Sequence, residues 1–282
     1  MKKTKTIPNL SLFFDFMKSA GRIALKNYHG KHTQNYKSEK ITDIVTETDL
    51  AISDLFARFV KEHFSNLDYI IIDEENIKKL GDKPIDAALK HEWQFVLDPI
   101  DGTLTYSLQI PMFGISVGIL RNGKPYAGII YAPVLGEIVY SDGKNAFWIT
   151  NAFKKSEKIM QLKKQPVDPR ALILAAHNRA IYINVRNLSK NDTISGFYSA
   201  VVHLLYMATG RGRAYYFNAY VWDMAGSWAA LNCMGINFMD YDTGKIIDFS
   251  STSFKEGARV RNLQIVCRPD DFEYMKKITT KL

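Results

Sequence analysis

The stretch 113–150 constrains the fold more than any other part of the sequence, because it places turn signals at short intervals between apolar segments. The pairs Asn122-Gly123, Leu135-Gly136 and Asp142-Gly143 divide it into four β-rich segments. Asn-Gly and Asp-Gly pairs favour the tight turns that join antiparallel strands. The stretch therefore predicts an antiparallel meander of four strands.

Helices and buried strands are predicted before the meander. Apolar residues at helical spacing predict two helices, and Thr46 or Thr48 is placed to cap the second. Two short apolar runs have the length of buried strands, and acidic residues follow each at once. The predicted helices contain residues 12–25 and 52–60, and the predicted strands residues 69–72 and 93–98. The polar stretch 77–92 is interpreted as a loop.

The second half of the chain changes character. The lysine-rich stretch 151–170, with Pro166 and Pro169, is interpreted as the boundary between an N-terminal α+β lobe, 1–155, and a C-terminal α/β lobe, 156–282. Strands are predicted over 171–177, 213–217 and 263–268, and helices over 196–210, over 223–235 and from Pro269 onward. The whole pattern predicts an α+β protein in which helices pack outside and between sheets.

Composition and charge limit the function classes. Hydrophobic residues make up 46% and charged residues 23% of the 282 residues, as in globular proteins. No apolar run reaches the roughly 18 residues of a membrane span. The N-terminus imitates a secretory signal, but Asp15 and Lys18 interrupt its apolar run, so we expect a cytoplasmic protein. Cys233 and Cys267 lack metal-binding spacing and are interpreted as core thiols.

The segment "FVLDPIDGTLTY" over 95–106 raises the main chemical question, because Asp98 and Asp101 follow an apolar strand on one short loop. Two carboxylates held close together repel each other, and burial makes each ionised form costlier. A shared proton, an arginine partner or a divalent cation would offset this cost. A shared proton is disfavoured because such pairs converge from two loops. An arginine partner stays open, although none occurs between Arg58 and Arg121.

A divalent cation gains support because acidic residues recur at other element ends. Glu74 and Glu75 follow the strand over 69–72, and Asp223 opens a predicted helix. Oxygen ligands without histidine or cysteine favour Mg²⁺, with Mn²⁺ as a substitute. Pro99 stiffens the loop so that both aspartates can face one side, and the Ile100 carbonyl is then free to be a further ligand.

Gly102 and Thr103 complete this candidate site. Glycine lets backbone N–H groups approach an anion closely, and a helix that begins here would favour phosphate at its N-terminus. A divalent cation beside a phosphate-binding loop outlines a hydrolytic site.

Four separated motifs carry a family resemblance. "DPIDGT", preceded by "TDIVTETD" and "DEEN" and followed by "WDMAG", resembles the inositol monophosphatase family of metal-dependent, lithium-sensitive phosphatases, in order over nearly the whole chain. The resemblance implies a layered α/β/α/β/α sandwich, a homodimer, and two or three Mg²⁺ ions. The implied metal ligands are Glu74, Asp98, the Ile100 carbonyl, Asp101 and Asp223. Thr103 and Glu74 would orient the attacking water, and Asp49, paired with Thr48, would support the metal region.

The implied substrate contacts come from Gly102, Thr103, Ser199 and Ala200, and here the sequence departs from the family. Inositol-cleaving members commonly have a glutamate after the "AYY" strand, where this chain has Phe217 and Asn218. Tyr198 also replaces a small residue. We expect an altered, aromatic-lined substrate pocket that Tyr198, Tyr216, Phe217 and Tyr220 border, and poor affinity for myo-inositol 1-phosphate.

Other candidate residues are interpreted as structural. His203 has no neighbouring base or nucleophile in the pattern, and Arg211 and Arg213 fit a solvated turn. Asp73 and Glu75 stay open as ligands.

The sequence therefore predicts a Mg²⁺-dependent phosphomonoesterase for a small polyol, sugar or nucleotide phosphate. The alternatives are a 3′(2′),5′-bisphosphate nucleotidase, a fructose-1,6-bisphosphatase, or a non-catalytic partner of RNA or the transcription machinery. The net charge of +8 would suit the last of these, but the lysines are spread along the chain. No membrane partner is expected.

Overall fold

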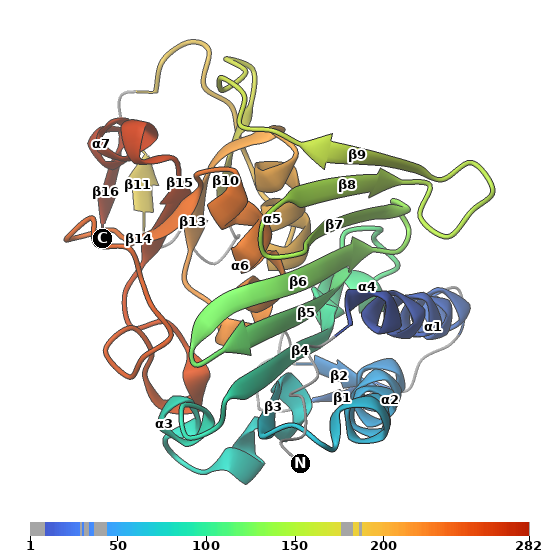
Figure 1. Ribbon diagram of the computed structural model, residues 1–282. Helices are drawn as coiled ribbons and strands as arrows, with labels where there is room; N and C mark the ends of the chain where they lie inside the picture. The colour runs from blue at the N-terminus through green and yellow to red at the C-terminus, as the bar shows by residue number, and fades with distance from the viewer. Residues whose placement is uncertain are drawn as a thin grey trace.

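A seven-stranded sheet forms one half of the protein (Figure 1). The computed structural model describes residues 9–28, 30, 34–36, 44–175, 183–185 and 188–281. The sheet has the order β3-β4-β5-β6-β7-β8-β9, and only β3 and β4 pair in parallel. Its strands are β3 (Tyr69–Asp73), β4 (Trp93–Asp101), β5 (Gly114–Arg121), β6 (Lys124–Ala132), β7 (Glu137–Ser141), β8 (Ala146–Thr150) and β9 (Lys158–Leu162). The predicted meander is thus present as β5 to β8.

Helices α1 (Leu10–Tyr28) and α2 (Glu47–Phe64) cover one face of this sheet, as their apolar spacing predicted. Phe13 of α1 lies against Phe59 of α2 and Phe95 of β4, at centroid distances of 5.1 and 5.8 Å. Thr46, rather than Thr48, caps α2. The short strands β1 (Gln34–Tyr36) and β2 (Ile44–Thr46) pair with each other, and residues 37–43 lie outside the described residues.

Helices α5 (Ala200–Ala208) and α6 (Val221–Cys233) lie between the two sheets and share one apolar core with both. Two glycines let α6 approach β5 and β6 at backbone distance. A Cβ at Gly118 would lie 2.4 Å from the Ala225 Cβ, and one at Gly128 would lie 2.4 Å from the Gly226 carbonyl oxygen. The position of α6 is therefore fixed by contacts that leave no room for a methyl group.

A five-stranded sheet in the order β12-β10-β13-β15-β14 forms the fourth layer. Its strands are β10 (Leu172–Ala175), β12 (Ile194–Ser195), β13 (Gly212–Phe217), β14 (Asn237–Asp240) and β15 (Gln264–Cys267). Helix α7 (Pro269–Ile278) packs on its far face, and β11 (Ile183–Val185) pairs with β16 (Thr279–Lys281) nearby. The order helices, sheet, helices, sheet, helix is the α+β, α/β/α/β/α sandwich that the resemblance implied.

Several elements differ from the prediction. The stretch 77–92 is not a plain loop, because it contains most of the 3₁₀ helix η1 (Glu74–Leu80) and α3 (Pro84–Ala88). The Asp73 carboxylate caps η1, and Pro84 starts α3, so local capping forms these helices without an apolar repeat. The lysine-rich stretch 151–170 contains β9, whose residues are mostly exposed. The first sheet thus ends at Leu162, and the division into two lobes stays a prediction.

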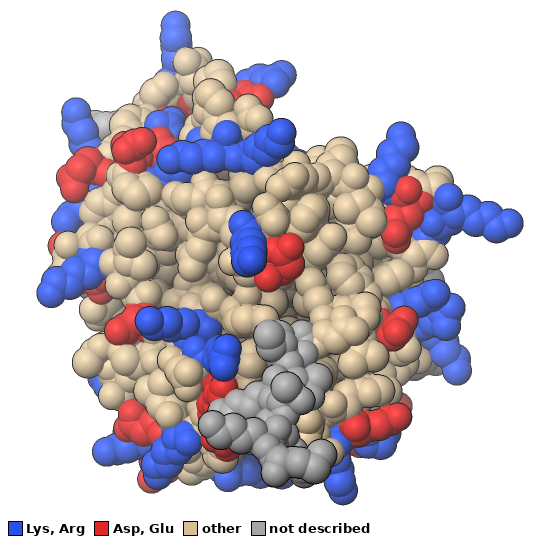
Figure 2. Space-filling model, viewed as in Figure 1, with Lys and Arg blue, Asp and Glu red and all other residues tan. Residues whose placement is uncertain are grey.

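The surface and the helices agree with the charge and hydropathy analysis. Lys and Arg side chains lie apart from one another on the face seen in Figure 2, with neutral surface between them. Within the described residues, every helix is too short or too polar to cross a membrane.

Candidate metal centre

Asp98 and Asp101 come to the same side of the chain because β4 is irregular at its end. Asp98 pairs with Ser116 of β5, but Asp101 pairs with Gly114, so the register shifts between the two aspartates. Such an irregularity re-aims side chains that regular alternation would place on opposite faces. One carboxylate oxygen each of Asp98, Asp101 and Asp223 lies within 4.8 Å of the others. The structure thus brings three of the predicted ligands together.

Asp223 reaches this cluster from the first turn of α6. The Tyr220 backbone N–H donates a hydrogen bond of 2.5 Å to Asp223 Oδ2, so the carboxylate also caps its own helix. Ser116 of β5 ties the helix to the sheet, because its Oγ donates to the Trp222 carbonyl at 2.8 Å and accepts from the Gly226 N–H at 3.3 Å. The distance between Asp223 and the two aspartates of β4 therefore depends on how α6 packs against the sheet.

Burial and mutual repulsion destabilise the ionised carboxylates of the cluster. Burial raises the pKa of Asp98 well above its usual range, with further increments from Glu74, Asp101 and Asp223. Burial also raises the pKa of Asp101 to about 6 and that of Asp223 well above normal. Among the described residues, no lysine or arginine forms an ion pair with these three aspartates. The arginine alternative therefore has no support in the described structure.

A proton shared by Asp98 and Asp223 stays open, because their side chains lie within hydrogen-bond range, but one oxygen of the cluster is unsatisfied. Asp98 Oδ1 is buried and has no hydrogen-bond partner in the described part of the chain. A buried acceptor without a partner costs free energy unless something else binds it. Three buried carboxylates with one unbonded oxygen, and no sulfur or imidazole ligand beside them, fit a hard divalent cation such as Mg²⁺.

Glu74 and Asp49 lie near the cluster but outside the closest three. Glu74 begins η1 directly after β3, which runs parallel to β4, and its charge raises the pKa of Asp98. Asp49 accepts from the Thr46 N–H and hydroxyl, not from Thr48 as expected, because it completes the capping box of α2. Thr48 instead bonds the Tyr106 hydroxyl at 3.1 Å. Burial raises the pKa of Asp49 to about 8.

Gly102 and Thr103 form the turn after β4. Gly102 has a φ of 85°, and a Cβ there would lie 2.8 Å from Thr105 Oγ1, so glycine is required both for conformation and for space. The short helix α4 (Thr103–Ser107) begins directly after Gly102, which meets the condition stated for a helix at this point. The Thr103 hydroxyl donates to the Ile100 carbonyl at 3.1 Å, which places two predicted site groups side by side.

Ser199 and Ala200 have a partner that the sequence did not suggest. The Ser199 hydroxyl and the Val201 N–H both donate to Asp101 Oδ2, the second at 2.6 Å, and the Ala200 N–H also lowers the pKa of Asp101. The first turn of α5 therefore orients the Asp101 carboxylate. A contact of Ser199 or Ala200 with substrate stays a prediction. The contacts of Val201, Tyr220 and Ser116 could not be predicted, because no sequence pattern reports which backbone or hydroxyl group faces a distant residue.

The aromatic residues expected around the pocket divide into two pairs. Tyr198 and Tyr220 are 38% and 37% exposed. Tyr216 and Phe217 are 1% and 0% exposed, because successive side chains of β13 point into the cores on opposite faces of the sheet. The prediction that all four border the pocket is therefore wrong for Tyr216 and Phe217.

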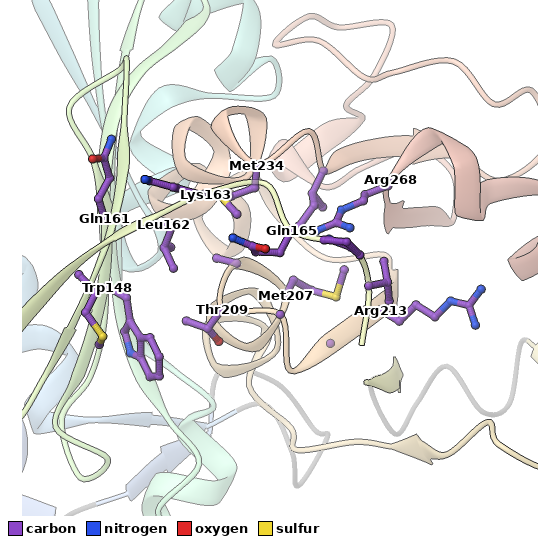
Figure 3. A pocket seen from close by; sticks show the side chains of 17 residues that line it. Trp148, Gln161, Leu162, Lys163, Gln165, Met207, Thr209, Arg213, Met234 and Arg268 are labelled. Atoms are coloured by element: carbon purple, nitrogen blue, oxygen red, sulfur yellow. The ribbon is translucent and has the colours of Figure 1, made fainter. Parts of the chain in front are cut away.

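A cavity of about 290 Å³ lies away from this centre, at the other ends of α5 and α6 (Figure 3). Trp148, Met207, Met234 and Arg268 are among its lining residues, and none of the candidate site residues lines it. Arg213 at its edge pairs with Asp271 at 2.9 Å. Arg211 pairs with Glu137 at 2.6 Å. Both arginines thus have structural roles.

Comparisons with known proteins agree with this geometry. A family model described as the inositol monophosphatase family matches residues 10–273. Inositol monophosphatase 1 of Solanum lycopersicum is 29% identical over 223 residues, 77% of this chain and 78% of the relative. The inositol-1-monophosphatase ImpA of Mycolicibacterium smegmatis is 30% identical over 202 residues, 68% of each chain.

Solved structures share the fold. A Thermotoga maritima IMPase superposes with a TM-score of 0.70 at 18% identity and covers 95% of both chains. An IMPase/NADP phosphatase, solved with NADP and Ca²⁺, gives a TM-score of 0.74 at 18% identity and covers 97% of both.

Proposed function

This chain belongs to the inositol monophosphatase family and is a phosphoric monoester hydrolase, and from that premise we propose that it hydrolyses a small polyol, sugar or nucleotide phosphate with Mg²⁺. The observation that carries the proposal is the buried cluster of Asp98, Asp101 and Asp223, with its unbonded Asp98 oxygen. Bringing three buried carboxylates together raises the cost of folding unless a cation binds them.

The candidate site residues fall into groups with different proposed roles. Asp98, Asp101 and Asp223, with Glu74 and the Ile100 carbonyl, would hold the cations. Bound Mg²⁺ supplies a Lewis acid that polarises the phosphoryl group and lowers the pKa of water. Thr103 and Glu74 orient the attacking water, and Asp49 adds negative charge behind the ligands.

Positioning of the phosphate falls to the turn after β4. The backbone N–H groups of Gly102 and Thr103 bind it, and Ser199 and Ala200 hold Asp101 in place beside it. These groups fix the ester before the chemical step, which is where much of the rate enhancement of phosphoryl transfer arises.

Structural neighbours of this chain were solved with different phosphate esters bound. One neighbour was solved with NADP and Ca²⁺, and a dual specific IMPase/NADP phosphatase was solved with D-inositol-1-phosphate. For this chain we keep a 3′(2′),5′-bisphosphate nucleotidase and a fructose-1,6-bisphosphatase as alternatives. We further propose a cytoplasmic homodimer that is inhibited by lithium and accepts Mn²⁺ in place of Mg²⁺.

Phosphate release from a panel of esters tests the proposal. The panel contains myo-inositol 1-phosphate, adenosine 3′-monophosphate, 3′-phosphoadenosine 5′-phosphate and fructose 1,6-bisphosphate. We expect release from at least one ester, abolished by EDTA and restored by Mg²⁺. We also expect that kcat/KM for the inositol ester does not lead by more than about tenfold, equivalent to roughly 1.4 kcal/mol. Absence of hydrolysis together with salt-sensitive RNA binding would favour the non-catalytic alternative.

A further inference from the structure

The Arg259 guanidinium packs against the segment that leads into α6. The rings of Tyr220 and Trp222 stack with centroids 4.6 Å apart and planes inclined by 4°. The Arg259 guanidinium carbon lies over the Tyr220 ring, 5.6 Å from its centroid. Backbone pairing between Tyr220 and Arg259 holds the two segments together. We name Asn218, Tyr220, Trp222 and Arg259 the rim stack.

Asn218 orients the arginine further. Arg259 Nε donates to the Asn218 side-chain oxygen at 3.1 Å, and Nη2 donates to the Asn218 carbonyl at 3.3 Å. These bonds and the ring contact restrict the guanidinium in advance, so little side-chain entropy remains to be lost when it binds a further group.

The charge of Arg259 is not balanced by a described carboxylate. No ion pair is found for Arg259 within the described residues, although Glu256 lies only three positions earlier. Its Nη1 has no hydrogen-bond acceptor there either. Other part-buried arginines of this protein, Arg211 and Arg213, each pair with a carboxylate. Arg259 therefore keeps a charged, half-buried donor available.

The rim stack is continuous with the metal centre. Asn218 and Tyr220 lie directly before the first turn of α6, and the Tyr220 N–H bonds Asp223 Oδ2 at 2.5 Å. Asp223 in turn lies within 4.8 Å of Asp98 and Asp101. An ester whose phosphate occupies the metal centre would extend its alcohol part over this rim.

We propose that Arg259 binds a second anionic group, a phosphate or a carboxylate, on the alcohol part of the substrate. The inference rests on the proposed function, because it concerns the mouth of the same site. It specifies the substrate class as phosphomonoesters that carry another negative charge. Guanidinium groups suit this task because they bind both anions through paired N–H donors.

Matched pairs of esters test this inference. 3′-Phosphoadenosine 5′-phosphate is compared with adenosine 3′-monophosphate, and 3-phosphoglycerate with glycerol 1-phosphate, each as a ratio of kcat/KM. We expect the doubly anionic member to lead by roughly tenfold or more in at least one pair, since hydrogen bonds between charged groups are strong. A preference within the adenosine pair would indicate that Arg259 binds a phosphate, and a preference within the glycerol pair would indicate that it binds a carboxylate.

Variants assign the preference to its residue. Arg259→Gln should reduce the leading ratio about tenfold, mainly through KM, and Arg259→Lys should keep most of it because the charge remains. Arg261→Gln is the control, since Arg261 is exposed and donates only to the Ser251 carbonyl among described groups. It should leave the ratios unchanged. Equal ratios in wild type, or a ratio that survives Arg259→Gln, would overturn the inference.

Failure of the proposed function gives a different result. If wild-type protein cleaves none of the four esters, calorimetric titration with 3′-phosphoadenosine 5′-phosphate in Mg²⁺ replaces turnover. Binding weakened by Arg259→Gln but not by Arg261→Gln then supports the anion site alone. Equal binding by both variants, or no binding by wild type, refutes it.

Discussion

The ionised form of Asp98 is strongly destabilised by the protein around it. It is buried, one of its oxygens is unbonded within the described residues, and burial and four other carboxylates raise its pKa. A residue with these properties is costly for stability, so its value must lie in what it binds.

Asp98→Asn should therefore reduce turnover on the order of 10³-fold or more, because the change removes negative charge from the cation-binding cluster. Steady-state kinetics in saturating Mg²⁺ measures the effect. Glu75→Gln is the control, since Glu75 lies beside Glu74 but outside the cluster, and its effect should be milder. Near-normal turnover of Asp98→Asn would refute the assigned role.

His203 gives a prediction that concerns stability. It is fully buried, its Nε2 accepts the Phe197 N–H at 2.9 Å, and burial lowers its pKa to about 3. In the unfolded chain the His203 imidazole binds a proton near pH 6.5, whereas in the folded protein it stays neutral down to about pH 3. The free energy of unfolding should therefore fall as the pH drops from about 6.5 toward 3.

Urea unfolding between pH 7 and pH 4 tests this sign. Wild type should lose up to about 1.4 kcal/mol per pH unit more than His203→Gln, which cannot titrate. Parallel pH profiles for the two proteins would contradict the prediction.

At this scale the sequence predicted three carboxylates that the structure brings together, but not their surroundings. Asp98, Asp101 and Asp223 could be predicted because each ends or begins an element within a recognisable motif. The burial of Tyr216 and Phe217 could not be predicted. Their strand lies in a sheet that is covered on both faces, so side chains on either face of the strand are buried. The Arg259 contact with Asn218 joins residues far apart in sequence, and no local pattern reports it.

At the scale of elements, the position of α6 determines whether Asp223 lies close to Asp98 and Asp101. It carries Asp223 and lies against β5 and β6, the first of which pairs with the strand that carries Asp98. The glycines of that contact are therefore part of the site, although they touch no ligand.

Gly128→Ala should lower Mg²⁺ affinity by roughly tenfold or more, since overpacking shifts backbone and costs about 1–3 kcal/mol. Gly21→Ala is a matched control, because its Cβ would lie 2.3 Å from the Tyr131 ring on the opposite face of the same sheet. Calorimetric Mg²⁺ titration, with thermal melts alongside, separates the two variants. Equal loss of affinity in both would show that general destabilisation is the cause.

The elements themselves divide by the strength of their sequence signals. The meander and the long helices have clear periodicity and turn residues, and all are present. Strand β9 was missed because its residues are mostly exposed and lie within a lysine-rich stretch, so only its pairing with β8 makes it a strand. Helices η1 and α3 form through capping and a proline, which a hydropathy pattern does not report.

At the scale of the whole molecule, the metal centre joins layers that come from distant parts of the chain. β4 supplies Asp98 and Asp101, α6 supplies Asp223, and α5 orients Asp101. Bound cations would therefore connect the seven-stranded sheet to the helices that support the second sheet.

Mg²⁺ should accordingly raise the melting temperature of wild-type protein by a few degrees, since ligand at 100 times Kd adds about 2.7 kcal/mol of stability. Asp98→Asn should lose most of this gain. It should also melt higher than wild type in EDTA, because it relieves repulsion among buried carboxylates. Scanning calorimetry measures both effects, and a melting temperature independent of Mg²⁺ in wild type would contradict the assignment.

The rim stack also bears on how such a protein changes over generations. Asp98, Asp101 and Asp223 are buried and lie within 4.8 Å of one another, so a substitution of any of them would alter the candidate metal centre itself. Arg259, Asn218 and Tyr220 are only partly buried, and they meet outside the apolar cores. After a gene duplication, one copy could therefore exchange these residues and acquire a new substrate while it inherits the hydrolytic centre unaltered.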